Sequence, residues 1–201
     1  MKGIGGHQSA KARTVEWLTP PDLKEKLGSF DLDPCSPVNR PWDTAKVHYT
    51  KRDNGLTKPW FGDVWLNPPY DRGVVGLWLS KMAEHGRGVA LIFARTETED
   101  FFRYVFNNAD SILFIKGRLH FYNQRGERAN ANSGAPSVLI AYGENNVERL
   151  HASGIPGKHL LLHNSPKWCG DPPADVIPHI AYGNARAARL INSSGGLWGG
   201  Y

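Results

Sequence analysis

Hydrophobic and polar positions recur with two different periods along the first 142 residues, which indicates strands and helices in succession. Apolar residues at helical spacing predict three helices, at 19–27, 76–84 and 97–106. Continuous apolar runs typical of strands covered on both faces lie at 64–66, 89–94, 111–115 and 137–142. Shorter strands are predicted at 30–33 and 47–50. In the first helix we expect Thr19 as the N-cap, Pro20 as the first helical residue and Gly28 as the end.

The order of these elements predicts an α/β fold. Strands alternate with helices up to residue 115, and the last strand follows a non-helical loop at 123–136. Such an alternation gives a mostly parallel sheet, and a final strand reached without a helix is expected to run antiparallel. Asp33 and Asn67 are only 34 positions apart, too few for two complete strand–helix units. We therefore expect a compact Rossmann-like sheet that is trimmed at one edge.

The chain divides into three regions. Residues 1–13 are polar, basic and Gly-rich, so we expect a flexible lead and, for want of an apolar segment, no secretory signal. Residues 14–142 carry the periodic pattern and form the predicted domain. From residue 143 the periodicity fades, and 143–201 is predicted to be an appendage of uncertain structure, with short elements at 160–162, 177–181 and 186–191.

Composition narrows the functional classes. A chain of 201 residues with 40% hydrophobic residues is long enough for a real core, and no apolar run has the roughly 18 residues of a membrane span. The two cysteines are far apart, so we expect no disulfide framework or zinc site and a cytoplasmic location. The eight histidines show no metal-binding spacing. A net charge of +5 is compatible with a polyanionic partner but does not require one.

One stretch, Asn67-Pro68-Pro69-Tyr70, carries candidate chemistry. Adjacent prolines lack N–H groups and have a fixed φ, so they end the preceding strand and hold Asn67 extended at its tip. The Asn67 side chain and a nearby main-chain carbonyl then offer two oxygen acceptors beside the ring of Tyr70. Such a group can hold a planar molecule that bears an exocyclic –NH2. Taken alone, these four residues are more often an ordinary strand-ending turn.

Further motifs, in order along the chain, change that balance. They are Thr19-Pro20-Pro21, Leu32-Asp33-Pro34-Cys35, Asp53-Asn54-Gly55-Leu56, Trp65 to Tyr70, Phe93 to Thr96, and Lys116 to Phe121. Together they resemble S-adenosylmethionine-dependent amino-methyltransferases acting on DNA, most of all the short phage and prophage DNA N6-adenine methyltransferases often called Dam-like. The likeness covers about residues 14–142. It implies a Rossmann-like methyltransferase sheet and an adenine-specific DNA methyltransferase located in the cytoplasm, that of a bacterial host if phage-encoded.

The resemblance also implies the site residues. The catalytic group would be Asn67, Pro68, Pro69 and Tyr70, with two oxygens holding the amine and the ring stacking on a flipped-out base. S-adenosylmethionine would contact Thr19, Pro20, Asp33, Pro34, Cys35, Asp53, Leu56 and Asn67. Asp33 and Cys35 would lie beside the methionine amino group. Since methyl transfer is direct, Cys35 need not be a nucleophile and is interpreted as a small buried residue. The usual glycine-rich loop after the first strand is replaced by residues 36–39.

Double-stranded DNA is the expected partner. Its candidate contacts, besides Tyr70, are Arg95, Arg118, Arg125 and Arg128. The segment 123–130 mixes arginines with Asn and Gln side chains suited to base edges, although a solvated hairpin-like loop has the same composition. No metal site is predicted.

Three alternatives stay open on the residues alone. Cytosine also has an exocyclic amine, so an N4-cytosine methyltransferase fits the same motif. A catalytically silent DNA-binding protein could keep the fold. RNA is a weaker option, because aromatic stacking and basic charge serve both nucleic acids.

Overall fold

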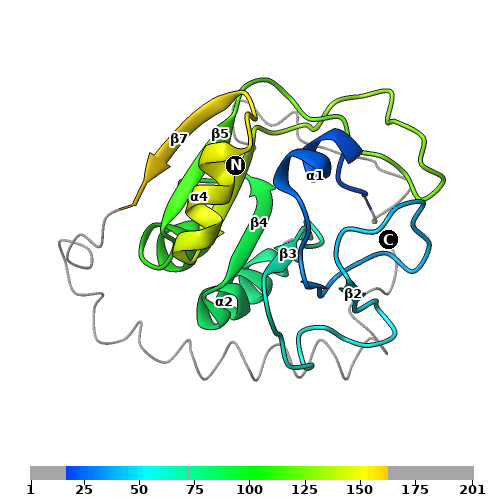
Figure 1. The fold of residues 1–201 in the computed structure, drawn as a ribbon, viewed down its shortest axis with the longest axis horizontal. Coiled ribbons are helices and arrows are strands. Elements are labelled where there is room, and N and C mark those ends of the chain that lie inside the picture. The colour runs from blue at the N-terminus through cyan, green and yellow to red at the C-terminus, as the bar shows by residue number, and fades with distance from the viewer. Residues whose placement is uncertain (1–16, 72, 163–201) are drawn as a thin grey trace, which may run out of the picture.

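The computed structural model of the protein describes residues 17–71 and 73–162. The predicted lead, 1–13, and the appendage beyond residue 162 lie outside the described residues. The described part is one mixed sheet with helices on both faces (Figure 1). None of its helices is long and apolar enough to cross a membrane.

Seven strands form the sheet among the described residues: β1 (Leu32–Asp33), β2 (Val47–His48), β3 (Val64–Leu66), β4 (Gly88–Phe93), β5 (Ser111–Ile115), β6 (Ser137–Tyr142) and β7 (Gly157–Leu161). Their order across the sheet is β2-β1-β3-β4-β6-β5-β7. Strands β2, β1, β3 and β4 are parallel neighbours. The last predicted strand, β6, inserts antiparallel between β4 and β5. The predicted α/β sheet, mostly parallel with an antiparallel strand reached by a loop, is confirmed.

The helices are α1 (Pro21–Leu27), α2 (Val75–His85), α3 (Glu99–Phe101) with its π-helical continuation η1 (Phe102–Phe106), and α4 (Glu144–Ala152). The predicted N-cap of the first helix was wrong. Pro20 occupies that position, and no side chain caps α1. The first helical residue is Pro21 rather than Pro20, and its fixed φ suits a helix start, so the Thr19 hydroxyl is left for another contact. The predicted helix at 97–106 begins at Glu99, where the Thr98 hydroxyl accepts the Phe101 N–H.

Alternating side chains of the strands build two cores, one on each face of the sheet. Val64 and Leu66 pack with α2, α3 and η1, whereas Trp65 between them packs with α1 and α4. The same alternation divides the residues of β4 between the two faces. The central strands are therefore covered on both sides, as their continuous apolar runs predict.

The sheet is trimmed at the β1–β2 edge, as predicted. Both strands have two residues, and within the described residues the connections 34–46 and 49–63 contain no helix. Loops take the place of helices there and pack closely. A Cβ on Gly55 would lie 1.9 Å from the Pro34 carbonyl oxygen, so only glycine allows these two loops to meet.

The sheet also continues past residue 142, the predicted end of the domain. Helix α4 packs on one face, and β7 pairs antiparallel with β5 over five residue pairs, from Ser111↔Leu161 to Ile115↔Gly157. The fading periodicity has a physical reason. β7 is an edge strand, and only its central residue is partly shielded, so it carries little of the apolar pattern.

We predict that Leu150→Ala in α4 lowers the free energy of unfolding by about 2–5 kcal/mol, because it leaves a cavity in a filled core. Leu150 is only 2% exposed. The control is Glu148→Ala, an exposed change in the same helix that we expect to stay within about 0.5 kcal/mol of wild type. Urea unfolding measures both. Equal stability of the two variants would mean that α4 is not part of the core.

Candidate active site

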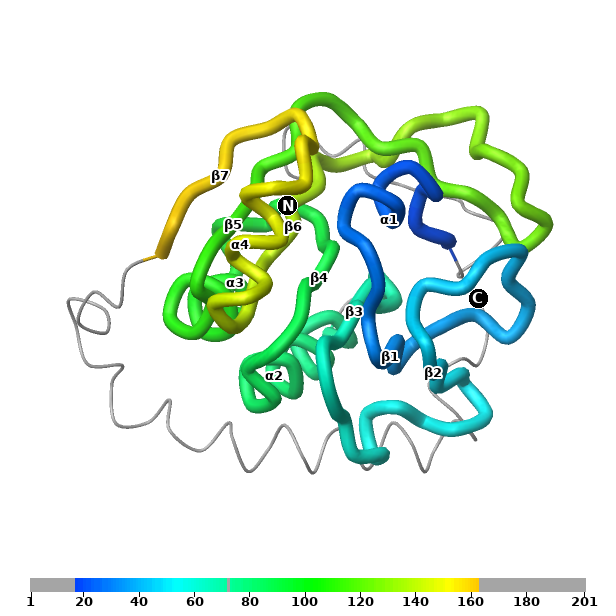
Figure 2. The backbone as a smooth tube through the Cα atoms, in the orientation of Figure 1, coloured from blue at the N-terminus to red at the C-terminus, as the bar shows by residue number. Residues whose placement is uncertain are grey.

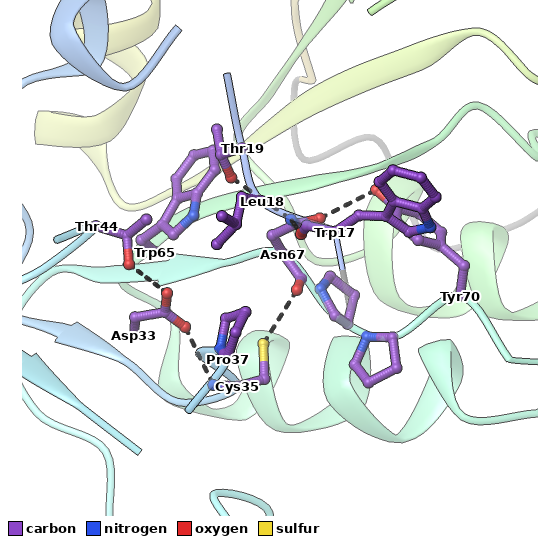
Figure 3. A pocket seen from close by; sticks show the side chains of 12 residues that line it. Trp17, Leu18, Thr19, Asp33, Cys35, Pro37, Thr44, Trp65, Asn67 and Tyr70 are labelled. Atoms are coloured by element: carbon purple, nitrogen blue, oxygen red, sulfur yellow. Dashed lines mark hydrogen bonds between the residues drawn. The ribbon is translucent and has the colours of Figure 1, made fainter. Parts of the chain in front are cut away.

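A pocket opens where β1 and β3 end. The connection from β1 leads to β2 on one side, and β3 lies on the other side of β1, so this is the point where the strand order switches. The pocket holds about 450 Å³ of empty space, part of it open to solvent. It is lined by Trp17, Leu18, Thr19, Asp33, Cys35, Pro37, Thr44, Trp65, Asn67, Pro68, Pro69 and Tyr70 (Figure 3).

The Asn67 side chain is held in one orientation at the centre of this pocket. Its Nδ2 lies 3.1 Å from the Trp17 carbonyl oxygen and 3.5 Å from the Thr19 hydroxyl. A carbonyl only accepts hydrogen bonds, so the nitrogen must face Trp17 and the oxygen must face the other way. Asn67 Oδ1 accepts the Tyr70 hydroxyl at 3.2 Å. The amide therefore presents its acceptor on the Tyr70 side.

Tyr70 is fixed by its hydroxyl and by its ring. The hydroxyl lies 3.2 Å from both Asn67 Oδ1 and the Leu91 carbonyl, two acceptors for one proton. Burial raises the pKa of this phenol, so the hydroxyl stays protonated and donates. The ring stacks on Phe93 with centroids 4.1 Å apart and planes 23° apart. Phe93 thus covers one face of the Tyr70 ring.

Two main-chain carbonyls follow the end of β3 and differ in their partners. The Asn67 carbonyl accepts the Cys35 thiol at 3.2 Å. Burial and the neighbouring Asp33 raise the pKa of Cys35 well above its usual range, so the sulfur is a protonated thiol rather than a thiolate. The Pro68 carbonyl accepts no hydrogen bond from residues 17–71 or 73–162. It is an unused acceptor in the residue after Asn67, and both residues line the pocket.

Asp33 is a buried carboxyl at the end of β1, only 4% exposed. One oxygen accepts the Cys35 N–H at 3.1 Å, and the other accepts the Thr44 hydroxyl. Burial raises the pKa of Asp33 to about 6, although both hydrogen bonds lower it. The charge of Arg40 also lowers the pKa, but no Lys or Arg side chain forms an ion pair with this carboxyl among the described residues, so the site favours a positively charged ligand group.

Four of the residues predicted to bind the cofactor do not line the pocket: Pro20, Pro34, Asp53 and Leu56. Asp53 Oδ2 accepts the N–H and hydroxyl of Thr50 at 2.9 and 3.0 Å, and these bonds lower the pKa of Asp53. Leu56 packs against the core on the α2 face. The loop 53–56 is nevertheless close to the pocket wall, because Gly55 contacts Pro34.

The four candidate DNA-binding arginines, Arg95, Arg118, Arg125 and Arg128, are all exposed, and none lines the pocket. Arg125 and Arg128 belong to a small hairpin. Tyr122 forms bridges to both Leu18 and Arg128, and the Asn123 side chain accepts the N–H groups of Arg125 and Glu127. Figure 2 shows this hairpin beside the 34–46 loop. There the Trp42 and Tyr122 rings meet edge to face at 5.4 Å.

Sequence reasoning missed Trp17, Leu18, Pro37, Thr44 and Trp65 as lining residues. It placed Phe93 at the rim of the site but did not foresee that its ring stacks on Tyr70. Phe93 had a usable signal, because it is the last residue of β4 and parallel strands end at one edge. Thr44 had none, since its contact with Asp33 depends on the path of an irregular loop. No three His, Cys, Asp or Glu side chains in the described part of the chain gather in a way that could hold a metal ion.

Comparison with protein families matches residues 7–159 to the family described as DNA N-6-adenine-methyltransferase (Dam). The chain belongs to this family. No curated protein and no solved structure matches the chain. The class of enzyme is therefore an adenine-specific DNA methyltransferase, with DNA as the substrate. The resemblance inferred from the ordered motifs is confirmed, and adenine is favoured over cytosine by membership of the Dam family.

We predict that Asp33→Asn stabilises the protein by about 3 kcal/mol at pH 7.5, because it removes a buried charge, and burial raises the pKa of Asp33 from 3.8 to about 6. The unfolded carboxyl titrates near 3.8 and the folded one near 6, so the folded state binds more protons in between. The contribution of protonated Asp33 to the free energy of unfolding is thus complete below about pH 4 and is lost as the pH rises through about 6.

Urea unfolding between pH 4 and 8 measures this effect, with Asp71→Asn, an exposed site, as the control. The Asp33→Asn protein should lack that part of the pH dependence. If it were less stable than wild type at pH 7.5, the hydrogen bonds from Thr44 and Cys35 would outweigh the burial of charge.

Proposed function

We propose that this Dam-family protein transfers a methyl group from S-adenosylmethionine to the exocyclic N6 of an adenine flipped out of double-stranded DNA. The observation that carries the proposal is the orientation of the Asn67 amide. The Trp17 carbonyl holds Nδ2, so the acceptor Oδ1 is turned toward Tyr70, and the carbonyl of the next residue, Pro68, accepts no hydrogen bond from the described residues. Two acceptors at the end of one strand suit the two hydrogens of a primary amine.

Holding the amine in this way supplies its reactivity. The adenine N6 lone pair is delocalised into the ring, which makes the free base a poor nucleophile. Hydrogen bonds from both N–H groups to Asn67 Oδ1 and the Pro68 carbonyl favour a pyramidal nitrogen with a localised lone pair. Neither oxygen is basic enough to keep a proton, so the proton lost from nitrogen passes to water. Catalysis is then a matter of position and electrostatics.

Tyr70 supports the base. Phe93 covers one face of its ring, so the target base would stack on the other face. The pocket lies at the strand ends. A base that stays stacked in an intact duplex could not enter it, whereas a nucleotide flipped out of the duplex could. The hydroxyl of Tyr70 has the Leu91 carbonyl as a second acceptor, so it can release Asn67 Oδ1 when the amine arrives.

The pocket suits the amino-acid end of S-adenosylmethionine. When bound, this cofactor supplies an electrophilic methyl group on a positively charged sulfur. Asp33 is a buried carboxyl without an ion-pair partner among the described residues, so it would bind the α-ammonium group. Thr19 and Cys35 border the same pocket, and Asn67 joins it to the amine site. Pro20, Pro34, Asp53 and Leu56 remain candidates for outer contacts, with Asp53 and Leu56 toward the adenosine.

The strand order arranges the two substrates. Asp33 ends β1, Asn67 follows β3, and Tyr70 reaches the Leu91 carbonyl of β4, and these three strands are neighbours in that order. A cofactor held at β1 and a base held at β4 would meet at Asn67. The site is thus laid out for direct, in-line transfer without a covalent intermediate on Cys35.

The exposed arginines are proposed as backbone contacts to DNA. Arg125 and Arg128 project from the hairpin next to the pocket wall at Leu18, and Arg95 and Arg118 follow the ends of β4 and β5. Contacts of this kind would position the duplex, whereas the pocket selects the base.

We expect Asn67→Ala to lower the methylation rate at saturating cofactor by at least about 100-fold, because an acceptor used in the transition state is lost. The assay incubates unmethylated DNA with methyl-labelled S-adenosylmethionine and analyses the nucleosides. Wild type should place the label in N6-methyladenine. Asn145→Ala, at an exposed position of α4, is the control and should retain full activity.

Three other outcomes of this assay have distinct meanings. Label in N4-methylcytosine would replace adenine by cytosine as the target. No label, with cofactor still bound, would indicate a catalytically silent DNA-binding protein. Wild-type activity of Asn67→Ala would remove the assigned role of Asn67.

We further expect the double variant Arg125→Ala/Arg128→Ala to reduce the slope of log K against log salt for duplex DNA by about 1 to 2. Each lost phosphate contact releases about one counterion fewer. Fluorescence anisotropy with a labelled duplex at several salt concentrations measures the slope. Lys158→Ala, on the far sheet edge at β7, should leave it unchanged. An unchanged slope in the double variant would place the DNA elsewhere.

A further inference from the structure

Trp65 has an indole N–H that the fold leaves without a partner. The side chain is 1% exposed, and Nε1 makes no hydrogen bond within the described part of the chain. Trp65 packs on Phe30 on the α1 side of the sheet, with ring centroids 5.4 Å apart. Buried N–H groups without an acceptor are rare, because the lost hydration is not replaced. The Nε1 groups of Trp42 and Trp78 are unpaired in the same way, and of these three tryptophans Trp65 is the one that lines the pocket.

The position of the indole gives a reason for its unpaired N–H. Trp65 lines the pocket together with Asp33 and Thr44. Figure 3 shows Trp65, Thr44 and Asp33 at one end of the pocket and Tyr70 at the other, with Asn67 between them. The orphan donor is thus at the end where the ammonium group would bind, not at the end of the base.

The chemistry of this end needs a second contact. An α-amino acid carries a carboxylate next to its ammonium group, and placing it near the buried Asp33 carboxyl is unfavourable unless a donor compensates. No Lys or Arg side chain lines the pocket. Trp65 Nε1, an indole N–H that can only donate, is a donor of the required kind whose hydrogen is not already used.

We propose that Trp65 Nε1 donates a hydrogen bond to the α-carboxylate of the bound cofactor, so that Asp33 and Trp65 together recognise its zwitterionic end. This inference rests on the proposed use of S-adenosylmethionine. Nε1 is shielded from water, so the ligand meets it by displacing part of the wall. Leu18 and Thr19 line the same pocket, and Leu18 forms a β-bridge to Tyr122.

The test compares two ligands that differ only in the carboxylate. They are S-adenosylhomocysteine and S-adenosyl-3-thiopropylamine, its decarboxylated analogue, and calorimetry measures their dissociation constants. We expect wild type to prefer the first by about ten- to one-hundredfold, the range for a hydrogen bond to a charged group. Trp65→Phe keeps an aromatic ring without the N–H, and its preference should fall close to onefold.

Trp78→Phe is the matched control. Trp78 is also buried, at 3% exposure, and its Nε1 is likewise without a partner, but it stacks on Trp60 and does not line the pocket. This variant should keep the wild-type preference. Thermal unfolding of both variants shows whether each is folded. The preference is the ratio of the dissociation constants of the two ligands for one variant, so it does not change if the variant loses affinity for both ligands equally.

The outcomes separate this inference from the proposed function. A Trp65→Phe protein with the wild-type preference overturns the role of Trp65, while methylation of DNA by the wild type would still stand. A wild type that binds both ligands equally also overturns it. A wild type that binds neither ligand contradicts the use of S-adenosylmethionine itself. Loss of preference in Trp78→Phe as well would trace the effect to packing rather than to the N–H.

Discussion

The hydrogen bond from Asn67 Nδ2 to the Trp17 carbonyl is the contact on which the geometry of the site depends. It joins residues 50 positions apart and determines which atom of a nearly symmetrical amide faces the pocket. The two prolines after Asn67 also contribute, because neither has an N–H group that could donate to the carbonyls of Asn67 and Pro68. Without the N-terminal segment the amide could rotate and offer its –NH2 group, which would repel an amine. A short stretch outside the sheet thus determines the chemistry of a residue within it.

Asp33 lowers the stability of the fold but provides a group that a ligand can use. A carboxyl with a pKa raised to about 6 opposes folding near neutral pH, and Thr44 and Cys35 only reduce that effect. Trp65 adds an unsatisfied donor to the same end of the pocket. Unfavourable buried groups that converge on one cavity are expected where a ligand satisfies them. The cost in stability and the proposed affinity therefore have the same origin.

The sequence predicted the parts of the site that follow from strand ends. Asp33, Cys35 and Asn67 follow apolar runs, and parallel strands bring such positions together, so their meeting could be inferred. The orientation of Asn67 could not be, because it depends on one main-chain carbonyl of an irregular segment. Thr19 was assigned to a helix cap, since local patterns favour that role, yet Pro20 makes a cap unnecessary and the hydroxyl faces Asn67. Helix α4 was missed, and strand β7 was expected only as a short element at 160–162, because most of their residues are exposed or half-buried and carry little apolar pattern.

The trimmed edge of the sheet links the two halves of the proposed site. With no helix in the 34–46 connection, an irregular loop must both close the pocket through Thr44 and cover its own exposed side. It does so by packing Trp42 on Tyr122, and Tyr122 also bridges to Leu18 of the pocket wall. The hairpin proposed to touch DNA, the loop that holds Asp33 and the segment that orients Asn67 therefore share one set of contacts. A larger sheet with helices on this edge could shape its cofactor pocket and its DNA surface independently, whereas in this chain we expect a change in one proposed surface to affect the other through these contacts.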